Sequence, residues 1–387
     1  MTAWLLLPLG ALLVFPHLVY PAFMRGVRPR PPGPRSPWGS PPRVSVLIPA
    51  FNEAAHLAAK IENTLALDHP ADRLEILVCD DGSADDGAVI VEGFADRGVR
   101  LLRNAGNEGK PTALARLVAD ATGQVLLFTD ASAMLRSDTL AKLLDALADP
   151  EVGLACARYL VRPPAEGDRP TEAAYWDHEA GIRRDEAARD MLLGVSGAAY
   201  ALRGGLWPPL PPDTINDDWV VPLQVLAAGH RIAYVHEAVA GDHPTTDARG
   251  LTNRWVRIAY GNYQMLWRHR DLVRRGPRFA LPMARKLLRT AGPVLLVAAG
   301  GVVVVGAALG DPLALGLLAL GGVGGALTAI ALLAPSTGWG AAAPLRAARF
   351  AALSQAAYLR GAWRFVRRQR DGIWRREEGA WPNTPST

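Results

Sequence analysis

Long apolar runs lie near both ends of the chain, and a mixed pattern of apolar and polar residues lies between them. Ala3–Met24 contains no Asp, Glu, Lys or Arg, and neither does Thr290–Gly310. Asp311-Pro312 ends the second run, and the next charged residue is Arg346. An apolar helix of about 20 residues crosses a hydrocarbon core of about 30 Å. The pattern predicts an N-terminal transmembrane helix and a transmembrane hairpin; the alternatives are a cleaved signal peptide and a buried helix pair.

The arginines beside these runs predict the orientation. Four of them follow the first run: Arg25, Arg28, Arg30 and Arg35. A signal peptide carries its basic residues before the apolar stretch instead. Because positively charged flanks stay in the cytoplasm, the N-terminus is expected outside the cell and the central domain inside. We therefore expect a multi-pass protein of the inner or plasma membrane with a cytoplasmic central domain.

Two further segments complete the predicted organisation. Val27–Arg43 is rich in proline and is expected to be extended. Arg346–Val366 mixes arginines with apolar residues, which favours a helix in the membrane interface over a fourth span. The predicted segments are a transmembrane helix at 1–26, a Pro-rich linker at 27–43, a cytoplasmic domain at 44–275, a transmembrane hairpin at 276–338, and an interfacial amphipathic helix with a basic tail at 339–387.

Apolar strands alternate with helices through the central domain. The segments "VSVLIPAF", "LEILVCD" and "GQVLLFTDASA" are strand-like, whereas "NEAAHLAAKIENTLAL", with Asn52 as its N-cap, and "GKPTALARLVADAT" have helical spacing. This alternation predicts an α/β fold with a doubly wound, mostly parallel sheet. Ligands bind beyond the carboxyl ends of such strands. Asn52, Asp80 and Asp130 follow three of the strands, so a site is expected at that edge.

Composition agrees with a part-soluble, part-membrane protein. The 387 residues are 50% hydrophobic and carry a net charge of +5, and the mean hydropathy is +0.08. Basic residues lie mostly beside apolar runs, which favours a membrane surface over nucleic acid. Cys79 and Cys156 lie in strand-like segments and are expected to be reduced core residues, and the sequence has no zinc-ligand spacing.

Six ordered motifs lie between Val44 and Arg268. They are "PAFNE", "VCDDGSADD", "NEGKPTAL", "FTDASA", "GVSGAAYALR" and "NDDWVVPLQVLAAGHRIAYV". Together they resemble the motifs of membrane-bound family-2 glycosyltransferases, the inverting group that includes cellulose and hyaluronan synthases. The resemblance implies a GT-A-type domain with flanking transmembrane helices, and a nucleotide-sugar donor that is expected to be UDP-linked.

The resemblance also implies which residues bind the nucleotide. Asp81 corresponds to the residue that reads the base, and Asp80 lies beside it. The backbone from Pro49 through Asn52 to Glu53 is expected to line the same pocket. From the residues alone, Asp-Gly-Ser is also ordinary turn chemistry.

A second group of residues is expected around the diphosphate. "FTDASA" is similar to the DxD signature that holds a divalent cation, with Asp130 at its first position and Ser132 at its second. Mg²⁺ and Mn²⁺ prefer oxygen ligands, so a hydroxyl can replace a carboxylate with less charge. Lys110 lies where a loop meets a helix, a place that suits a phosphate or a nucleotide edge. The alternative for Lys110 is a solvated surface lysine.

The stretch "INDDW" places two carboxylates before an apolar helix. The helix is predicted to run from Trp219 to Ala228 and to stop at Gly229. Free N–H groups in its first turn stabilise an anion there. By resemblance, Asp218 is the catalytic base and Asp217 the acidic residue before it. The alternative is plain N-capping.

The segment "RWVRIAYGNYQMLWR" falls where processive relatives carry QxxRW. Either Arg254-Trp255 supplies the RW pair, or Arg254 and Arg257 supply the spacing, and neither alignment includes the glutamine. We expect an inverting transferase that moves a sugar from a nucleotide-sugar to a glycan or lipid-linked acceptor at the cytoplasmic membrane face. Two alternatives stay open: a single-sugar polyprenyl-phosphate transferase, and a non-catalytic membrane protein that serves as a sensor or partner subunit.

Overall fold

The computed structural model describes residues 2–161, 171–242, 248–333 and 343–369. These residues form two compact units. The sheet unit contains Pro29–Leu251, and the membrane unit contains Met1–Arg28 together with Thr252–Arg370. The predicted basic tail beyond Gln369 lies outside the described residues.

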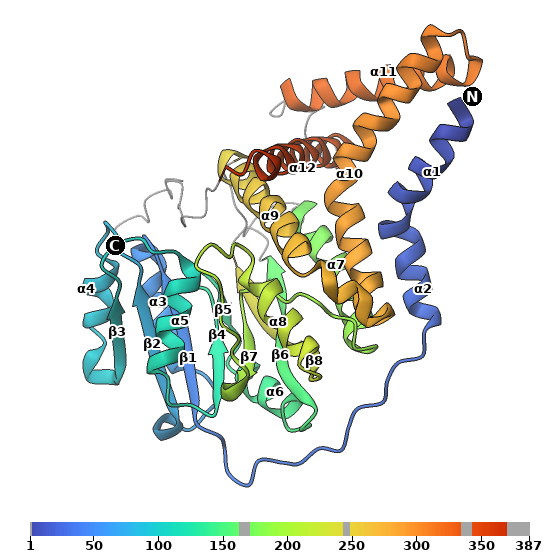
Figure 1. Cartoon of the computed structure of the whole chain (residues 1–387). Coiled ribbons are helices and arrows are strands. Elements are labelled where there is room, and N and C mark those ends of the chain that lie inside the picture. The colour runs from blue at the N-terminus through green and yellow to red at the C-terminus, as the bar shows by residue number, and fades with distance from the viewer. Residues whose placement is uncertain (1, 162–170, 243–247, 334–342, 370–387) are drawn as a thin grey trace. The chain divides into compact units, whose positions relative to one another are not determined.

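The sheet unit is built on an eight-stranded sheet with the order β3-β2-β1-β4-β7-β6-β8-β5 (Figure 1). The strands are β1 (Val44–Ala50), β2 (Leu74–Asp80), β3 (Val99–Arg103), β4 (Val125–Phe128), β5 (Met134–Leu135), β6 (Val152–Val161), β7 (Tyr200–Arg203) and β8 (Arg231–Asp242). The helices that accompany them are α3 (Ala54–Leu65), α4 (Gly87–Glu92), α5 (Lys110–Asp120), α6 (Thr139–Ala146), α7 (Thr171–Ala187) and α8 (Asp217–Ala227).

The half of the sheet from β3 to β4 is parallel. β1 is buried along its whole length and lies between β2 and β4, with Ala50 opposite Asp80 and Leu47 opposite Phe128. Parallel pairing brings the carboxyl ends of these strands to one edge. β7 is antiparallel to both β4 and β6, and β6 is parallel to β8. The predicted α/β fold is confirmed, with antiparallel pairs entering from β7 onward.

Aromatic stacking joins the two halves of the sheet. The Phe128 ring lies between those of Tyr200 and Trp207, with ring centroids 4.7 and 4.9 Å away. Phe128 and Tyr200 are also cross-strand partners on β4 and β7. Such stacked pairs add to the free energy that burial of the rings already supplies. The stacked rings therefore add packing at the point where the sheet changes from parallel to mixed.

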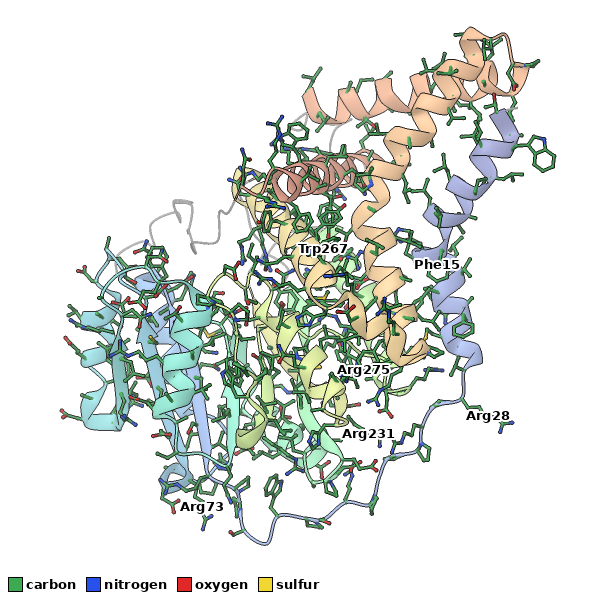
Figure 2. The ribbon with its side chains drawn as sticks, in the orientation of Figure 1. Phe15, Arg28, Arg73, Arg231, Trp267 and Arg275 are labelled. Carbon is green, nitrogen blue, oxygen red and sulfur yellow. The ribbon has the colours of Figure 1, made fainter. Side chains whose placement is uncertain are left out.

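The Pro-rich segment Pro29–Arg43, which we call the strap, is bound along the sheet unit. Arg30 Nη1 lies 2.9 Å from Asp190 Oδ2, and Arg231 Nε lies 2.9 Å from the other oxygen of the same carboxylate. Arg231, labelled in Figure 2, also donates to the carbonyl of Pro31 at 3.3 Å. Further hydrogen bonds join Gly33 to Asp149, Ser36 to Ala148 and Trp38 to Leu144. The segment is extended, as predicted, and is also fixed.

Among its described residues, the membrane unit has three helices that are long and apolar enough to cross a membrane: Thr2–Gly26, Pro277–Ala308 and Pro312–Ile330. The first consists of α1 (Thr2–Val14) and α2 (Tyr20–Gly26), joined by a π-helical turn at Phe15–Val19. Pro16 lies in that turn, and the backbone N–H that proline lacks explains the irregularity.

The second and third apolar helices form a hairpin. α10 (Pro277–Ala308) and α11 (Pro312–Leu333) are separated by a turn that contains Gly310 at φ +79°. Glycine suits this left-handed backbone because it has no Cβ. The short turn was predicted from Asp311-Pro312. The predicted end of the hairpin at residue 338 lies outside the described residues.

Two more helices, α9 (Ala248–Arg268) and α12 (Ala343–Val366), pack against each other in the membrane unit. Tyr263 stacks on Phe365 with ring centroids 5.7 Å apart. A Cβ at Gly361 would lie 2.6 Å from the Cβ of Ala259, so glycine is needed for the close approach. The placement of α12 in the membrane interface stays a prediction.

Candidate functional site

The loops that follow β1 and β2 are locked together. Asn52 has a positive φ of 53°, and its Oδ1 accepts a hydrogen bond from Ala84 N at 2.9 Å. Asn52 N donates to Ser83 Oγ, also at 2.9 Å. The predicted N-cap role of Asn52 is therefore wrong: Glu53 occupies the N-cap position of α3. The Asn52 side chain binds the neighbouring loop instead, which fixes the carboxyl ends of β1 and β2 to each other.

Asp80 and Asp81 have different surroundings, although they are adjacent. Asp81 is 0% exposed. Its Oδ1 accepts from Asn104 Nδ2 at 2.6 Å and from Glu108 N at 3.0 Å, and its Oδ2 accepts from Gly109 N at 2.8 Å. Asp80 is 9% exposed. Asp81 therefore holds the loop that leads to Lys110, and Asp80 is the carboxylate of this pair that keeps an exposed edge.

Three elements bring charged groups together around Lys110, the first residue of α5. Its Nζ lies 2.9 Å from Asp130 Oδ1, after β4, and 3.5 Å from Asp217 Oδ2, on α8. Burial opposes the ammonium form, but Asp130, Asp217 and Asp218 outweigh it and raise the pKa of Lys110. Lys110 is thus a permanent cation between two carboxylates, and the solvated surface alternative does not hold.

The segment Gly194–Ala198 is part of the same cluster. A Cβ at Gly197 would lie 3.1 Å from Asp130 Oδ2 and 3.3 Å from Lys110 Nζ. Gly194 lies against the Trp219 indole so closely that a Cβ would be 2.2 Å from a ring atom. Val195 N donates to the backbone oxygen of Asp218 at 2.9 Å. The two glycines therefore let the chain pass beside the charged groups, a role that the motif "GVSGAAY" alone does not reveal.

The two carboxylates of "INDDW" lie in the first turn of α8. The helix begins at Asp217, with Asn216 as its N-cap, which is two residues before the predicted start at Trp219. Neither aspartate is the N-cap. Asp217 is 4% exposed and faces Lys110, whereas Asp218 is half-buried. The more accessible carboxylate is thus the one that the family motif identifies as the base.

The residues around Lys110 fit a divalent cation that shares its ligands with a diphosphate. Within the described ranges, no three His, Cys, Asp or Glu side chains form a self-contained metal site. The Asp130 side chain is 41% exposed, so it can offer an oxygen to an ion, and Ser132 lies two residues further along the same turn. Mg²⁺ is commonly held by one or two carboxylates plus substrate phosphates. We therefore expect metal binding here to depend on the nucleotide.

Sequence reasoning missed two residues on α3 that support the Asp130 turn. Lys60 is 0% exposed and donates to Thr129 Oγ1 at 2.7 Å, and Asn63 exchanges two hydrogen bonds with the Leu135 backbone. A signal was present, because Lys60 has the helical spacing of the buried residues Leu57 and Ile61. Arg254 and Arg257, by contrast, lie on the part of α9 that belongs to the membrane unit.

Comparison with known proteins agrees with this geometry. Residues 45–203 match the model of "Glycosyl transferase family 2". An N-acetylglucosaminyltransferase of Rhizobium meliloti is 32% identical over 57% of this chain and 56% of its own length. A beta-monoglucosyldiacylglycerol synthase of Synechocystis is 25% identical over 59% of this chain and 50% of its own length. The chain spans about half the length of these two curated relatives.

One solved structure resembles nearly the whole chain. It is a mannosyltransferase from Pyrobaculum calidifontis in complex with GDP-Man and Mn²⁺, with a TM-score of 0.72 and 25% sequence identity. The likeness covers 95% of this chain and 99% of that one, and thus includes the apolar helices as well as the sheet. Together with the ordered motifs, these matches place residues 45–203 of the chain in glycosyl transferase family 2.

Proposed function

We propose that this protein is an inverting glycosyltransferase that moves a hexosyl group from a nucleoside-diphosphate sugar to a membrane-linked acceptor. The convergence of Lys110, Asp130 and Asp217 beside the accessible Asp218 carries the proposal. A cation between carboxylates at the strand ends suits a diphosphate, and a half-buried carboxylate beside it suits an acceptor hydroxyl. We assign contact with the nucleotide base to Asp80, because the Asp81 carboxylate is buried and accepts hydrogen bonds from other residues of the protein.

The chemistry assigned to Asp218 is general-base catalysis. Its carboxylate takes the proton from an acceptor hydroxyl while that oxygen forms a bond to the anomeric carbon of the donor. The bond between the anomeric carbon and the diphosphate breaks on the opposite face, and the electron pair leaves with the nucleoside diphosphate. Configuration at the anomeric carbon is therefore inverted. Asp217 holds Lys110 in place and does not exchange a proton with substrate.

Asp130 and the Ser132 hydroxyl would hold a divalent cation, Mg²⁺ or Mn²⁺. When bound, that ion would supply positive charge to the departing diphosphate. Lys110 contributes a second positive charge from the protein itself. Because its pKa is raised, this contribution does not change with pH in the neutral range.

The acceptor is proposed to be a lipid or a lipid-linked glycan. Three apolar helices in the described part of the chain support this assignment, and the Synechocystis relative is by name a beta-monoglucosyldiacylglycerol synthase. Single addition is favoured over polymerisation because the segment at Arg254 lacks the glutamine of QxxRW. The product is expected to stay in the membrane.

A panel of UDP- and GDP-sugars, each with Mg²⁺ or Mn²⁺, tests the function in membranes that contain the full chain. We expect one donor to be consumed and its sugar to appear in the lipid extract. Product length then separates a single-sugar transferase from a polymerase. If no donor is consumed and none binds to the purified protein, a non-catalytic role as sensor or partner subunit replaces the proposal.

The proposed orientation predicts opposite accessibility for two positions. Single cysteines are placed at Ser36, in the strap, and at Asp311, in the hairpin turn. Each is then treated with a membrane-impermeant thiol reagent. Because arginines follow the first apolar helix, we expect labelling at position 311 in intact cells and at position 36 only after permeabilisation. Cys79 and Cys156 are buried and serve as the unlabelled background. Labelling of both positions from the same side would contradict the orientation.

A further inference from the structure

Lys60 is a buried lysine beside the Asp130 turn. It lies on α3 and is 0% exposed. Its Nζ donates to Thr129 Oγ1 at 2.7 Å and also to the carbonyl oxygen of Ala133. These two acceptors flank Asp130, Ala131 and Ser132 in the sequence. Removing an amino group from water is costly, so a burial that serves only packing is better met by an apolar side chain.

The Thr129 hydroxyl extends this support to the neighbouring loop. It accepts from Lys60 and donates to Ala198 O at 2.7 Å. Ala198 follows Gly197, whose backbone lies against the Asp130–Lys110 pair. Lys60 therefore sits at a node that joins α3, the Asp130 turn and the Gly194–Ala198 segment.

Asn63, one helical turn later, holds the far end of the same turn. Its Nδ2 donates to Leu135 O, and its Oδ1 accepts from Leu135 N, both at 2.7 Å. The turn itself is closed by Ala133 N, which donates to Asp130 O at 3.2 Å. Residues 129–135 are thus held from α3 at their beginning, middle and end.

We propose that Lys60 is a positioning residue for the donor diphosphate and its cation, acting through the Asp130 turn. The inference rests on the proposed function. Ser132 stands where a second metal-binding carboxylate is expected, so the one carboxylate of this turn, Asp130, must present its oxygen correctly. A constellation of this kind has to be held within about 0.5 Å by the groups behind it. The hydrogen bonds of Lys60 supply that support without contact to substrate.

The test compares Lys60→Met with a matched control on the same helix. Thr64→Val is the control, because Thr64 is also 0% exposed but donates to Lys60 O and not to the turn. Both variants are made in the full chain and purified in lipid nanodiscs. Amide hydrogen exchange is measured across the sheet unit, and binding of UDP and of GDP is titrated with Mn²⁺ present and absent.

In Lys60→Met we expect exchange of the amides at 130–135 to accelerate about tenfold or more, with the rest of the sheet unit changed far less. The Mn²⁺-dependent part of nucleotide affinity should weaken about tenfold, while Thr64→Val keeps both values. If Lys60→Met does not fold, Asn63→Ala is measured instead. It keeps Lys60 and should accelerate hydrogen exchange of the same amides at 130–135. Uniform acceleration across the sheet unit, or unchanged exchange at 130–135 in Asn63→Ala, would overturn the proposal.

The two proposals fail separately. Absence of Mn²⁺-dependent nucleotide binding in the unsubstituted protein would count against the proposed function. Hydrogen exchange at 130–135 needs no ligand, so it judges the role of Lys60 in holding the turn by itself. Normal binding in the unsubstituted protein and equal binding in Lys60→Met would leave the function standing and reject the positioning role.

Discussion

Asp218→Asn is expected to lower turnover by about a hundredfold or more, the usual scale for the loss of a general base. The amide keeps the size of the carboxylate but cannot accept the acceptor's proton. Donor binding should persist, because Asp218 acts on the acceptor, and stability should change little, because Asn216 and not Asp218 is the N-cap of α8. Initial rates with the donor found in the panel, together with nucleotide affinity, measure both effects.

Asp138→Asn is the matched control for this substitution. Asp138 is also a carboxylate at a helix start, as the N-cap of α6, and it is paired with Arg136 and Lys142 away from Lys110. We expect near-normal turnover in this variant. Asp217→Asn should be milder than Asp218→Asn, because Lys110 keeps its closer partner Asp130. If Asp218→Asn turns over normally, the base must be sought elsewhere.

Asp130→Ala is expected to weaken Mn²⁺-dependent binding of the donor by about a hundredfold. The substitution removes the exposed carboxylate that we assign to the cation, and charge-assisted contacts of this kind are worth about 1.5–3 kcal/mol each. The fold should survive, because Asp217 remains 3.5 Å from Lys110 and leaves that buried charge with a partner. Titration of the nucleotide with and without Mn²⁺ separates the metal-dependent share.

Ser132→Asp provides the complementary variant. It restores a second carboxylate in the turn, so metal-dependent affinity should be preserved or increased. Full donor affinity of the unsubstituted protein in EDTA would remove the metal from the proposed mechanism. If Ser132→Asp weakens donor binding and the unsubstituted protein binds the donor normally in EDTA, we would assign donor binding to Lys110 alone.

The strands and the edge that carries the site could be predicted from the sequence, because continuous apolar runs followed by polar residues specify buried parallel strands. The different surroundings of Asp80 and Asp81 could not. Asp80 ends β2 and Asp81 follows it, and the burial of the Asp81 carboxylate depends on Asn104 and Gly109, which are distant in sequence. The predicted start of α8 was two residues too late, because Asn216, Asp217 and Asp218 are all good helix-start residues.

Lys60 and Lys110 show a second limit. Both are single lysines in helices with apolar neighbours. Because lysine side chains are mostly exposed to solvent, residue type alone predicts a solvated side chain for each. Their surroundings come from other elements: Thr129 and Ala133 for Lys60, and Asp130 and Asp217 for Lys110. Tertiary contacts, not local pattern, decide that one supports the turn and the other neutralises the site.

The strap imposes an order on biosynthesis. Arg30 is paired with a residue 160 positions later, and the carbonyl of Pro31 is bound by a residue 200 positions later. A ribosome adds about 5–20 residues per second, so roughly 10–40 s separate the emergence of Pro31 from that of its partner. During that interval the strap lacks this contact, and its pairing with Asp190 likewise waits for a residue that is made late in the sheet unit. The strap therefore reaches its final position on the sheet unit only after most of that unit has been synthesised, although it is the part that leaves the ribosome first.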